Sequence, residues 1–413
     1  MSFRSNPRTA LALLTTLNFL NYVDRYVLPA VQVPIEKEFH VGNAQFGLLT
    51  TAFFICYMVA AGPIGWLADR YSRRMIIAAG GIVWSGATLL TALTWDYETL
   101  FIRHLIVGIG EASFATIAPA FLSDLYGEEQ RGRVLAVFNI ALPFGAAVGL
   151  MVGGVLGARY GWHAPFYVGA IPGFVVSVLM LLVTEPKRGA QDHVEARPER
   201  THALQLFRNG AFLTASLGIA MLTFAENGIA TFMPKFLTEV RHYGMESANV
   251  IFGGITAFNG IVPVILGGWL GDRMLRRSDS AHYRLSGMAM GLAIPTMIVA
   301  IFVSGPTMWP AMFVTEFVLF LNTGPLNAAI VNSVSAPIRA TAIAANIFII
   351  HALGDVPAPY VMGWIADRSS LETAFGCAII ATALSCAILL YGARFAPHLR
   401  RNGAPDAAPP SPA

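Results

Sequence analysis

The chain alternates between long apolar stretches and short polar connections. Twelve stretches are mostly apolar over about 20 residues, the length that crosses a bilayer as an α-helix. They are predicted at 10–33, 44–68, 75–94, 98–126, 132–157, 164–183, 211–236, 247–271, 283–303, 308–334, 340–366 and 371–395. We therefore predict an all-α membrane protein with twelve transmembrane helices.

One polar segment separates the first six stretches from the last six. This segment, 184–210, is predicted to be a cytoplasmic linker between an N-terminal bundle at 1–183 and a C-terminal bundle at 211–401. The remaining tail, 402–413, is rich in Ala and Pro and is predicted to be disordered.

The composition agrees with a lipid environment. Of the 413 residues, 55% are hydrophobic and only 12% are charged, whereas soluble proteins carry about 25% charged residues. The net charge of +3 and the scattered basic residues do not indicate a nucleic-acid partner. Cys56, Cys377 and Cys386 fall inside apolar stretches, so we expect small core residues and neither a disulfide, a metal site nor a cofactor.

Lys and Arg predict the orientation, because cytoplasmic loops carry an excess of them. If both termini are cytoplasmic, 20 of the 27 basic residues lie on that side. The other side holds five, and two remain within the predicted helices: Lys37, Arg159, Lys235, Arg241 and Arg368 outside, and Arg25 and Arg103 within. We predict cytoplasmic termini.

A charged motif recurs at half the chain length. GWLADRYSRR begins at Gly65 and GWLGDRMLRR at Gly268, and the shorter echoes GVLGAR and GWIADR begin at Gly154 and Gly363. Such repetition indicates a duplicated architecture, and in a membrane protein it indicates a transporter built from structural repeats around a central site.

Acidic and basic residues end the helices that carry the motif. Simple anchoring at the cytoplasmic surface is one interpretation. The other is a latch, in which an aspartate pairs with basic residues or a helix N-terminus across the seam between the halves in one conformation only. The candidates for this latch are Asp69, Arg70, Arg73, Asp124, Asp272 and Arg273.

Ionisable residues also occur at membrane depth, where they are costly and usually face a cavity. The first predicted helix carries Asn18, Asn21, Asp24 and Arg25, which lie on one wall at helical spacing. Arg103 and Glu111 share the fourth helix, eight residues apart, and are expected to face broadly the same way. The second half adds Glu226, Asn227, Glu316, Asn322, Asn346, His351 and Asp355. His351 and Asp355 are four residues apart on one predicted helix, so their side chains can touch, either as functional groups or as a structural hydrogen bond.

Glu111 is the first candidate for a proton carrier and Asp24 the second. Burial favours the neutral acid, whereas a nearby arginine favours the carboxylate, so protonation can depend on which arginine the acid faces. Arg25 and Arg103 suit an anionic substrate group. The alternative, for Asp24 with Arg25 and for Arg103, is a buried pair that only holds helices together. Glu226 and Glu316 are the weakest candidates, and Glu316 could lie near a membrane face.

Glycines are spaced by four in the fifth predicted helix. Gly145, Gly149 and Gly153 share one face, so a neighbouring helix can approach closely. The face serves either packing alone or a seam along which the halves move.

The helix count, the two halves and G-x-L-x-D-R-x-x-R-R resemble the major facilitator superfamily. Longer stretches resemble its Spinster family: NYVDRYVLP, VGIGEASFATIAPAFLSDLY, FNIALPFGAAVGLMVGG, TEPKRG and HALGDVPAPYVMGWIADR. The resemblance covers most of the first half and 351–368, and is weaker between 211 and 334. It implies two pseudo-symmetric six-helix bundles and proton-linked movement of lipids with a charged head, such as sphingosine phosphate or lysophospholipids.

The expected partners are thus an amphipathic substrate, protons and membrane lipids, for a monomer in a bacterial inner membrane. Asn21, Arg25, Arg103, Glu226 and His351 are the substrate-binding candidates, and Asp24, Glu111 and Asp355 are the proton-coupling candidates. The rival functions are a symporter of small organic anions, a multidrug exporter, and a receptor or sensor without transport. An enzyme is not expected, because no HExxH, nucleophile elbow or metal-spaced cluster occurs.

Overall fold

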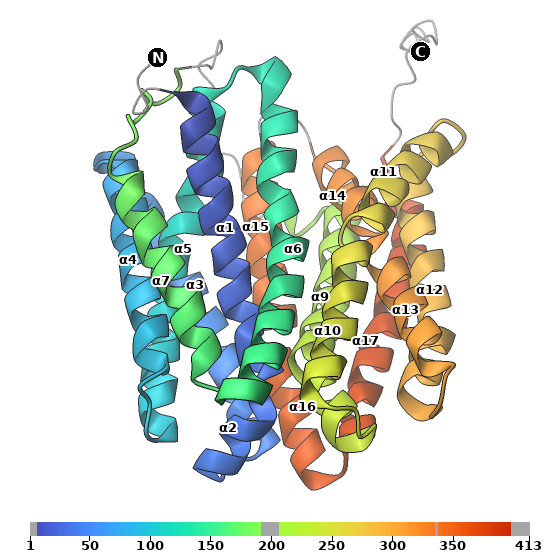
Figure 1. Ribbon diagram of the computed structural model, residues 1–413. Helices are drawn as coiled ribbons and strands as arrows, with labels where there is room; N and C mark the ends of the chain where they lie inside the picture. The colour runs from blue at the N-terminus through green and yellow to red at the C-terminus, as the bar shows by residue number, and fades with distance from the viewer. Residues whose placement is uncertain (1–5, 191–205, 335–337, 398–413) are drawn as a thin grey trace, which may run out of the picture.

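The computed structural model describes residues 6–190, 206–334 and 338–397. The first half of the chain forms seven helices, of which six run the length of the bundle and α2 is short (Figure 1). Their bounds are α1 (Pro7–Ala30), α2 (Gln32–Phe39), α3 (Asn43–Arg70), α4 (Arg73–Thr91), α5 (Tyr97–Leu125), α6 (Glu128–Tyr160) and α7 (Ala164–Met180). The predicted tail at 402–413 and most of the predicted linker lie outside the described residues.

The second half contains six further segments, several of which are interrupted. Their bounds are α9 (Gly210–Lys235) with η2 (Phe236–Val240), α10 (Met245–Asn259) with α11 (Val262–Leu275), α12 (Ala281–Phe302), α13 (Met308–Phe320) with α14 (Thr323–Asn332), α15 (Arg339–Ile350) with η4 (His351–Asp355) and α16 (Pro357–Arg368), and α17 (Leu371–Gly392) with η5 (Ala393–Phe395). The twelve predicted segments are therefore present, but three predicted as continuous helices are broken.

Proline accounts for two of these interruptions. Pro263 stands in the first turn of α11 and Pro357 begins α16. Because proline has no N–H to donate, a helix readily restarts there. Before Pro357 the chain forms a π-turn, in which the Val356 N–H donates to the His351 carbonyl at 3.0 Å. Such turns widen a helix locally and often occur at functional sites.

Ten helical segments of the described chain are long and apolar enough to cross a membrane, and the shorter Ala164–Met180 is also apolar. Helix α1 is not among them, because Asn18, Asn21, Asp24 and Arg25 lower its hydropathy. Those residues occupy one wall of the helix, so α1 spans the bundle with a polar side that other helices cover. The twelve-helix all-α architecture is thereby confirmed.

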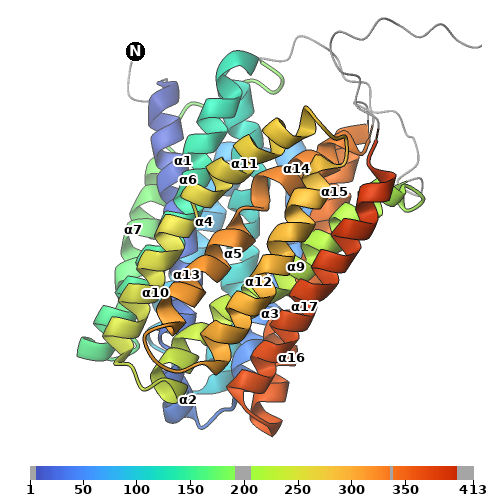
Figure 2. The same cartoon turned by 90° about the vertical axis from the view of Figure 1, so that its right-hand side faces the viewer.

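The two halves stand side by side, and both ends of the described chain lie at the same end of the bundle (Figures 1 and 2). We call this end, which holds the start of α1 and the end of α17, the terminal face. The other end, which holds α2 and the start of α3, is called the opposite face.

The halves meet along two lines, where α6 packs against α10 and α3 packs against α16. Contact along α3 is closest near the opposite face. A Cβ atom added to Gly47 would lie 2.1 Å from the Pro359 carbonyl oxygen, whereas one added to Gly62 would meet nothing within 4 Å. Helix α3 is therefore pressed against the second half near the opposite face, and this close packing does not extend to Gly62.

Within the first half, α1 and α6 pack through glycines as their spacing predicts. A Cβ atom on Gly149 would lie 2.5 Å from the Val23 carbonyl oxygen, and one on Gly153 would lie 2.5 Å from Ala30 Cβ. The close approach fixes α1, so that its polar wall takes a defined orientation toward the centre of the bundle.

Candidate functional site

A central cavity of 720 Å³ lies between the halves. It is lined from the first half by α1, α3, α5 and α6, and from the second half by α9, α10, α11, α13, α14, α15 and the π-turn η4. Its ionisable lining contains more acids than bases: Asp24, Glu111, Glu226, Glu316 and Asp355 against Arg25, His104 and His351.

Arg25 and Glu111 form an ion pair in this cavity. The Arg25 Nε donates to Glu111 Oε2 at 2.7 Å, and the Glu111 side chain is fully buried. The second oxygen, Glu111 Oε1, has no hydrogen-bond partner in the described part of the chain. The pair is thus tight, but one acceptor of a buried carboxylate remains unsatisfied.

Aromatic rings surround the Arg25 guanidinium. Its central carbon lies between 5.1 and 5.9 Å from four ring centroids, those of Tyr22, Phe53, Phe54 and Tyr57. Each ring face attracts the cation by about 0.5 to 2 kcal/mol, more when water is excluded. The rings therefore keep the guanidinium in place and help to stabilise its charge.

Asp24 also borders the cavity, but its carboxylate points toward α4. Its Oδ2 accepts from Trp84 Nε1 at 2.8 Å and from Thr88 Oγ1 at 3.3 Å, and both donors come from α4. Asp24 and Arg25 therefore do not pair with each other. The expected alternative of an Asp24–Arg25 pair that holds helices together does not occur.

His351 and Asp355 contact each other as their spacing predicts, at 2.6 Å between Nδ1 and Oδ2. The His351 ring stacks on Phe54 at 5.9 Å and meets Tyr57 edge-on at 5.8 Å between centroids. Because Phe54 and Tyr57 also flank Arg25, these two α3 rings connect the polar groups of both halves.

Glu226 and Glu316 line the second-half wall of the cavity. The expectation that Glu316 could lie near a membrane face is wrong: its side chain is buried and accepts from Thr256 Oγ1 at 3.2 Å. Residue spacing could not show where Glu316 lies. Helix α13 ends at Phe320, only four residues after Glu316, so the stretch predicted as one continuous helix is broken there.

Arg103 and Asn21 are not among the residues that line the cavity. The Arg103 guanidinium donates to Thr94 Oγ1 at 2.9 Å and to the Leu90 carbonyl, and lies 5.0 Å from the Trp95 ring. It therefore reaches toward the opposite face and not, as expected, the same way as Glu111. Asn21 is buried, and its Nδ2 lacks a hydrogen-bond partner within the described residues.

At the terminal face, Arg73 and Asp124 are joined inside the first half. Arg73 Nη1 donates to Asp124 Oδ2 at 2.5 Å, and Arg73 Nε contacts Glu185 Oε1 at 3.4 Å. Burial raises the pKa of the Glu185 carboxyl, but hydrogen bonds from Ser72 and the Arg73 N–H outweigh it, so that the net pKa lies below its usual range.

The other latch candidates lie on the exposed ends of α3 and α11. Arg70 covers the Trp66 ring at 4.0 Å and Arg273 covers the Trp269 ring at 5.5 Å. Asp69 and Asp272 stand beside them at the terminal face, both exposed. In this conformation the aspartates thus lie at their expected ends, and Arg70 and Arg273 contact tryptophans of their own helices.

Sequence reasoning missed the aromatic rings around Arg25 and the role of Glu185 in the Arg73 cluster. FFICY at 53–57 reads as ordinary lipid-facing sequence, because nothing in it shows that Arg25 lies opposite. Glu185 is part of TEPKRG, a stretch that resembles the family but does not by itself indicate an ion pair. Its position directly after an apolar helix and near a basic cluster was the available signal.

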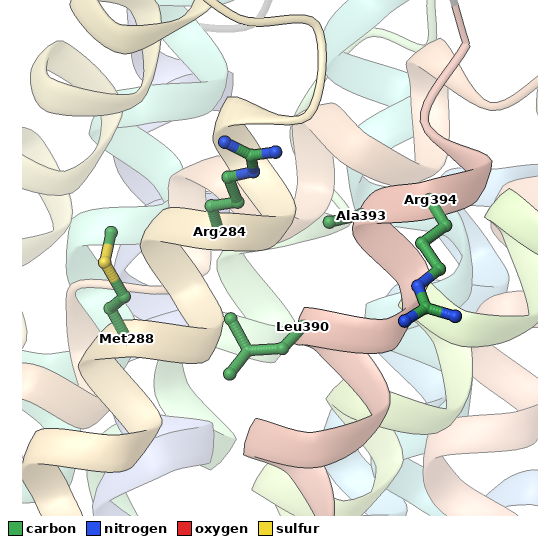
Figure 3. A pocket seen from close by; sticks show the side chains of 5 residues that line it. All are labelled: Arg284, Met288, Leu390, Ala393 and Arg394. Carbon is green, nitrogen blue, oxygen red and sulfur yellow. The ribbon is translucent and has the colours of Figure 1, made fainter.

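A smaller cavity of 380 Å³ lies in the second half, near the start of α12 and the end of α17, and Figure 3 shows the side chains that line it. It is lined by Arg284 and Met288 of α12, Leu390 of α17, and Ala393 and Arg394 of η5. It contains none of the candidate residues, so the central cavity is the candidate site.

The chain is similar to known membrane proteins along most of its length. The model of the Major Facilitator Superfamily matches residues 14–354. The sphingosine-1-phosphate transporter SPNS2 of Danio rerio is 33% identical over 386 residues, which cover 87% of this chain and 76% of that protein. Protein spinster of Drosophila melanogaster is 32% identical over 372 residues, 86% of this chain and 61% of that protein. The chain belongs to the Spinster family of the major facilitator superfamily.

Solved structures show the same fold. A bacterial homologue of the human lysosomal transporter Spinster, in an inward-facing and unoccupied conformation, superposes with a TM-score of 0.86 at 22% identity, covering 94% of this chain and 97% of that one. A bacterial Spinster homologue in an inward-facing and occupied conformation gives a TM-score of 0.79 at 24% identity, covering 95% of this chain and 96% of that one. The family model and the curated relatives, together with this fold, make the chain a multi-pass membrane transporter and not an enzyme.

Proposed function

We propose that this Spinster-family transporter couples protons to the movement of an amphipathic anion, such as a lysolipid or a sphingosine-phosphate-like lipid. The observation that carries the proposal is the Arg25–Glu111 pair. Among the described residues, Arg25 is the one arginine in the lining of the cavity, and it already pairs with the buried Glu111 carboxylate at 2.7 Å.

The coupling follows from competition for one cation. An anionic headgroup can bind Arg25 well only when Glu111 gives up its charge, because two anions against one guanidinium repel each other in a low dielectric. Protonation of Glu111 releases Arg25 to the substrate, and loss of that proton expels the substrate. The unsatisfied Glu111 Oε1 provides an oxygen at which the proton can reside.

The lining suits a substrate with a tail. Apolar side chains from both halves, among them Leu142, Leu222 and Phe252, share the cavity with the charged groups. A small hydrophilic anion would not need such walls, which favours the lipid over the rival small organic anion. SPNS2 of Danio rerio carries the name of a sphingosine-1-phosphate transporter, and this supports the same substrate class.

The second half is proposed to complete the proton path. His351 and Asp355 hold one another at 2.6 Å, and His351 contacts two of the rings that flank Arg25. Tilting of one half against the other would change the distance between this pair and Glu111. We propose Asp355 and Asp24 as secondary proton sites, and Asn21, Glu226 and His351 as substrate contacts.

The terminal face is proposed to be cytoplasmic, in a bacterial inner membrane, for a monomer divided at 1–183, 184–210 and 211–401. The uneven distribution of Lys and Arg supports this orientation. Labelling of single cysteines from one side of intact cells would test it.

The function is tested by flux into proteoliposomes. Lysophospholipids, sphingosine phosphate and small organic acids are supplied with and without a pH gradient. The proposal expects saturable, gradient-dependent flux of a lysolipid or sphingosine phosphate and little flux of acids that lack a tail. Binding of these lipids without any flux would instead favour a receptor.

A further inference from the structure

The two incomplete copies of the repeated motif lie at the opposite face. GVLGAR ends α6 and GWIADR ends α16, whereas the two full copies end α3 and α11 at the terminal face. Among described residues, the assigned hydrogen bonds and ion pairs that join the two halves lie toward the opposite face, and both incomplete copies contribute to them.

Asp367 of GWIADR binds the N-terminus of α3 in the other half. Its Oδ1 accepts from the Asn43 N–H at 2.7 Å and from Asn43 Nδ2 at 2.8 Å, and its Oδ2 accepts from the Ala44 N–H at 2.8 Å. The first N–H groups of a helix have no partner within it and carry a partial positive charge. A carboxylate from the second half thus completes the first turn of a first-half helix.

Arg159 of GVLGAR makes the corresponding contact on the second line between the halves. Its Nη2 and Nε donate to the two oxygens of Glu246, at 2.6 and 3.2 Å. Glu246 lies in the first turn of α10. The end of α6 therefore binds the start of α10 just as the end of α16 binds the start of α3, which is the symmetry expected of two repeated halves.

Asn43 connects this contact to a buried ion pair. Its Oδ1 accepts from Lys235 Nζ at 2.7 Å, and Lys235 also pairs with Glu36. Both charged side chains are only 8% exposed, so this pair is shielded from water and adds to the contact between the halves.

We propose that Asp367 with Asn43, and Arg159 with Glu246, form a latch that holds the opposite face closed and separates each time the cavity opens to that face. The latch expected for the full motif copies is thus formed here by the incomplete copies, while Asp69 and Asp272 remain exposed at the terminal face. Exposed ion pairs and helix caps are individually weak, as a latch that must open requires. The proposal depends on rocking of the two halves and not on the substrate.

The test measures the width of the opposite face by electron–electron double resonance in lipid nanodiscs. Spin labels are placed at Glu98→Cys and Ser304→Cys, in a chain whose three native cysteines are serines. Asp367→Ala should add a longer distance and raise the ratio of open to closed opposite faces roughly fivefold, the factor that corresponds to loss of a typical cap.

The matched control is Asp96→Ala. Asp96 also caps a helix at the opposite face, accepting from the Thr99 N–H at 2.7 Å, but it does so within its own half. This variant should leave the distances unchanged. If Asp367→Ala matches the parent protein, or if Asp96→Ala widens the face equally, the latch does not exist.

A steric and a charge variant supply independent tests. A Cβ atom at Gly363 would lie 2.3 Å from the Asn43 carbonyl oxygen, whereas one at Gly376 would meet nothing within 4 Å. Gly363→Ala should widen the opposite face and Gly376→Ala should not. Arg159→Glu should widen it as well, and adding Glu246→Arg should restore the parent distances. Failure of that rescue would exclude Arg159 from the latch.

Discussion

Arg25 occupies an unusual position for a membrane-embedded cation. It has one carboxylate partner at 2.7 Å and four aromatic rings around its guanidinium. The rings stabilise the Arg25 charge through their faces. This attraction does not use the N–H groups of the guanidinium, so those groups can still donate hydrogen bonds. Arg25 therefore remains able to donate to a second anion if Glu111 withdraws.

Replacing Arg25 by Ala should weaken binding of an anionic amphiphile roughly 10- to 100-fold, the range expected for a lost hydrogen bond to a charged group. Binding is measured by scintillation proximity with a radiolabelled lysolipid. Arg103→Ala is the matched control, because Arg103 bonds to Thr94 and Leu90 away from the cavity. Equal losses in both variants would remove Arg25 from the site.

Glu185 supports a prediction about stability and pH. Its folded-state pKa lies below the usual carboxyl value, so its stabilisation is present above that usual value of about 4.3 and is lost as the pH falls through the lowered pKa. Glu185→Gln should lower Tm at pH 7, and the difference from the parent should shrink by about pH 3.5. A Tm difference that is independent of pH, or one shared by the exposed control Glu98→Gln, would contradict this role.

At the scale of single residues, the sequence showed which ionisable side chains lie at membrane depth, where a charge is costly to bury. It did not show which of these side chains contact one another. The i,i+4 spacing of His351 and Asp355 was sufficient, because both lie on one helical segment. Arg25 and Glu111 belong to α1 and α5, so no spacing could pair them. Arg103 shares a helix with Glu111, yet its long side chain reaches back toward Trp95, a direction that periodicity does not determine.

The apolar pattern predicted the positions of the helices, but it did not predict the breaks within them. A stretch of about 20 apolar residues predicts a span, but it does not tell whether a proline inside it bends or ends the helix. Pro143 lies within the continuous α6, whereas Pro357 follows the π-turn at His351–Asp355. The difference depends on whether neighbouring helices satisfy the freed carbonyl groups.

The packing of α1 on α6 gives a prediction at the scale of elements. Gly149→Ala would place a Cβ atom 2.5 Å from the Val23 carbonyl oxygen, so it should destabilise the fold by about 1–3 kcal/mol through overpacking. Gly62→Ala is the control, because nothing lies within 4 Å of its added Cβ atom. Thermal unfolding in detergent measures both. Equal Tm values for the two variants would show that α1 and α6 can separate without cost.

For the whole molecule, repetition in the sequence predicted the architecture correctly. The two full motif copies lie at the terminal face, at the ends of α3 and α11, and the two echoes lie at the opposite face. The sequence could not show at which face the two halves would be in contact. The same motif residues are present whether their contacts between the halves are formed or broken. That choice depends on the conformation. Here, among the residues that the structure describes, the hydrogen bonds and ion pairs between the halves lie toward the opposite face.

The central claim is that one proton on Glu111 decides whether Arg25 is free for the substrate. It is tested most directly by uptake of a radiolabelled lysolipid into proteoliposomes at several pH gradients, with Glu111→Gln compared against the parent and the exposed control Glu98→Gln. We expect Glu111→Gln to bind the lysolipid and to exchange it across the membrane, but to lose all response of net uptake to the gradient. Net uptake that still follows the pH gradient in Glu111→Gln would contradict the claim.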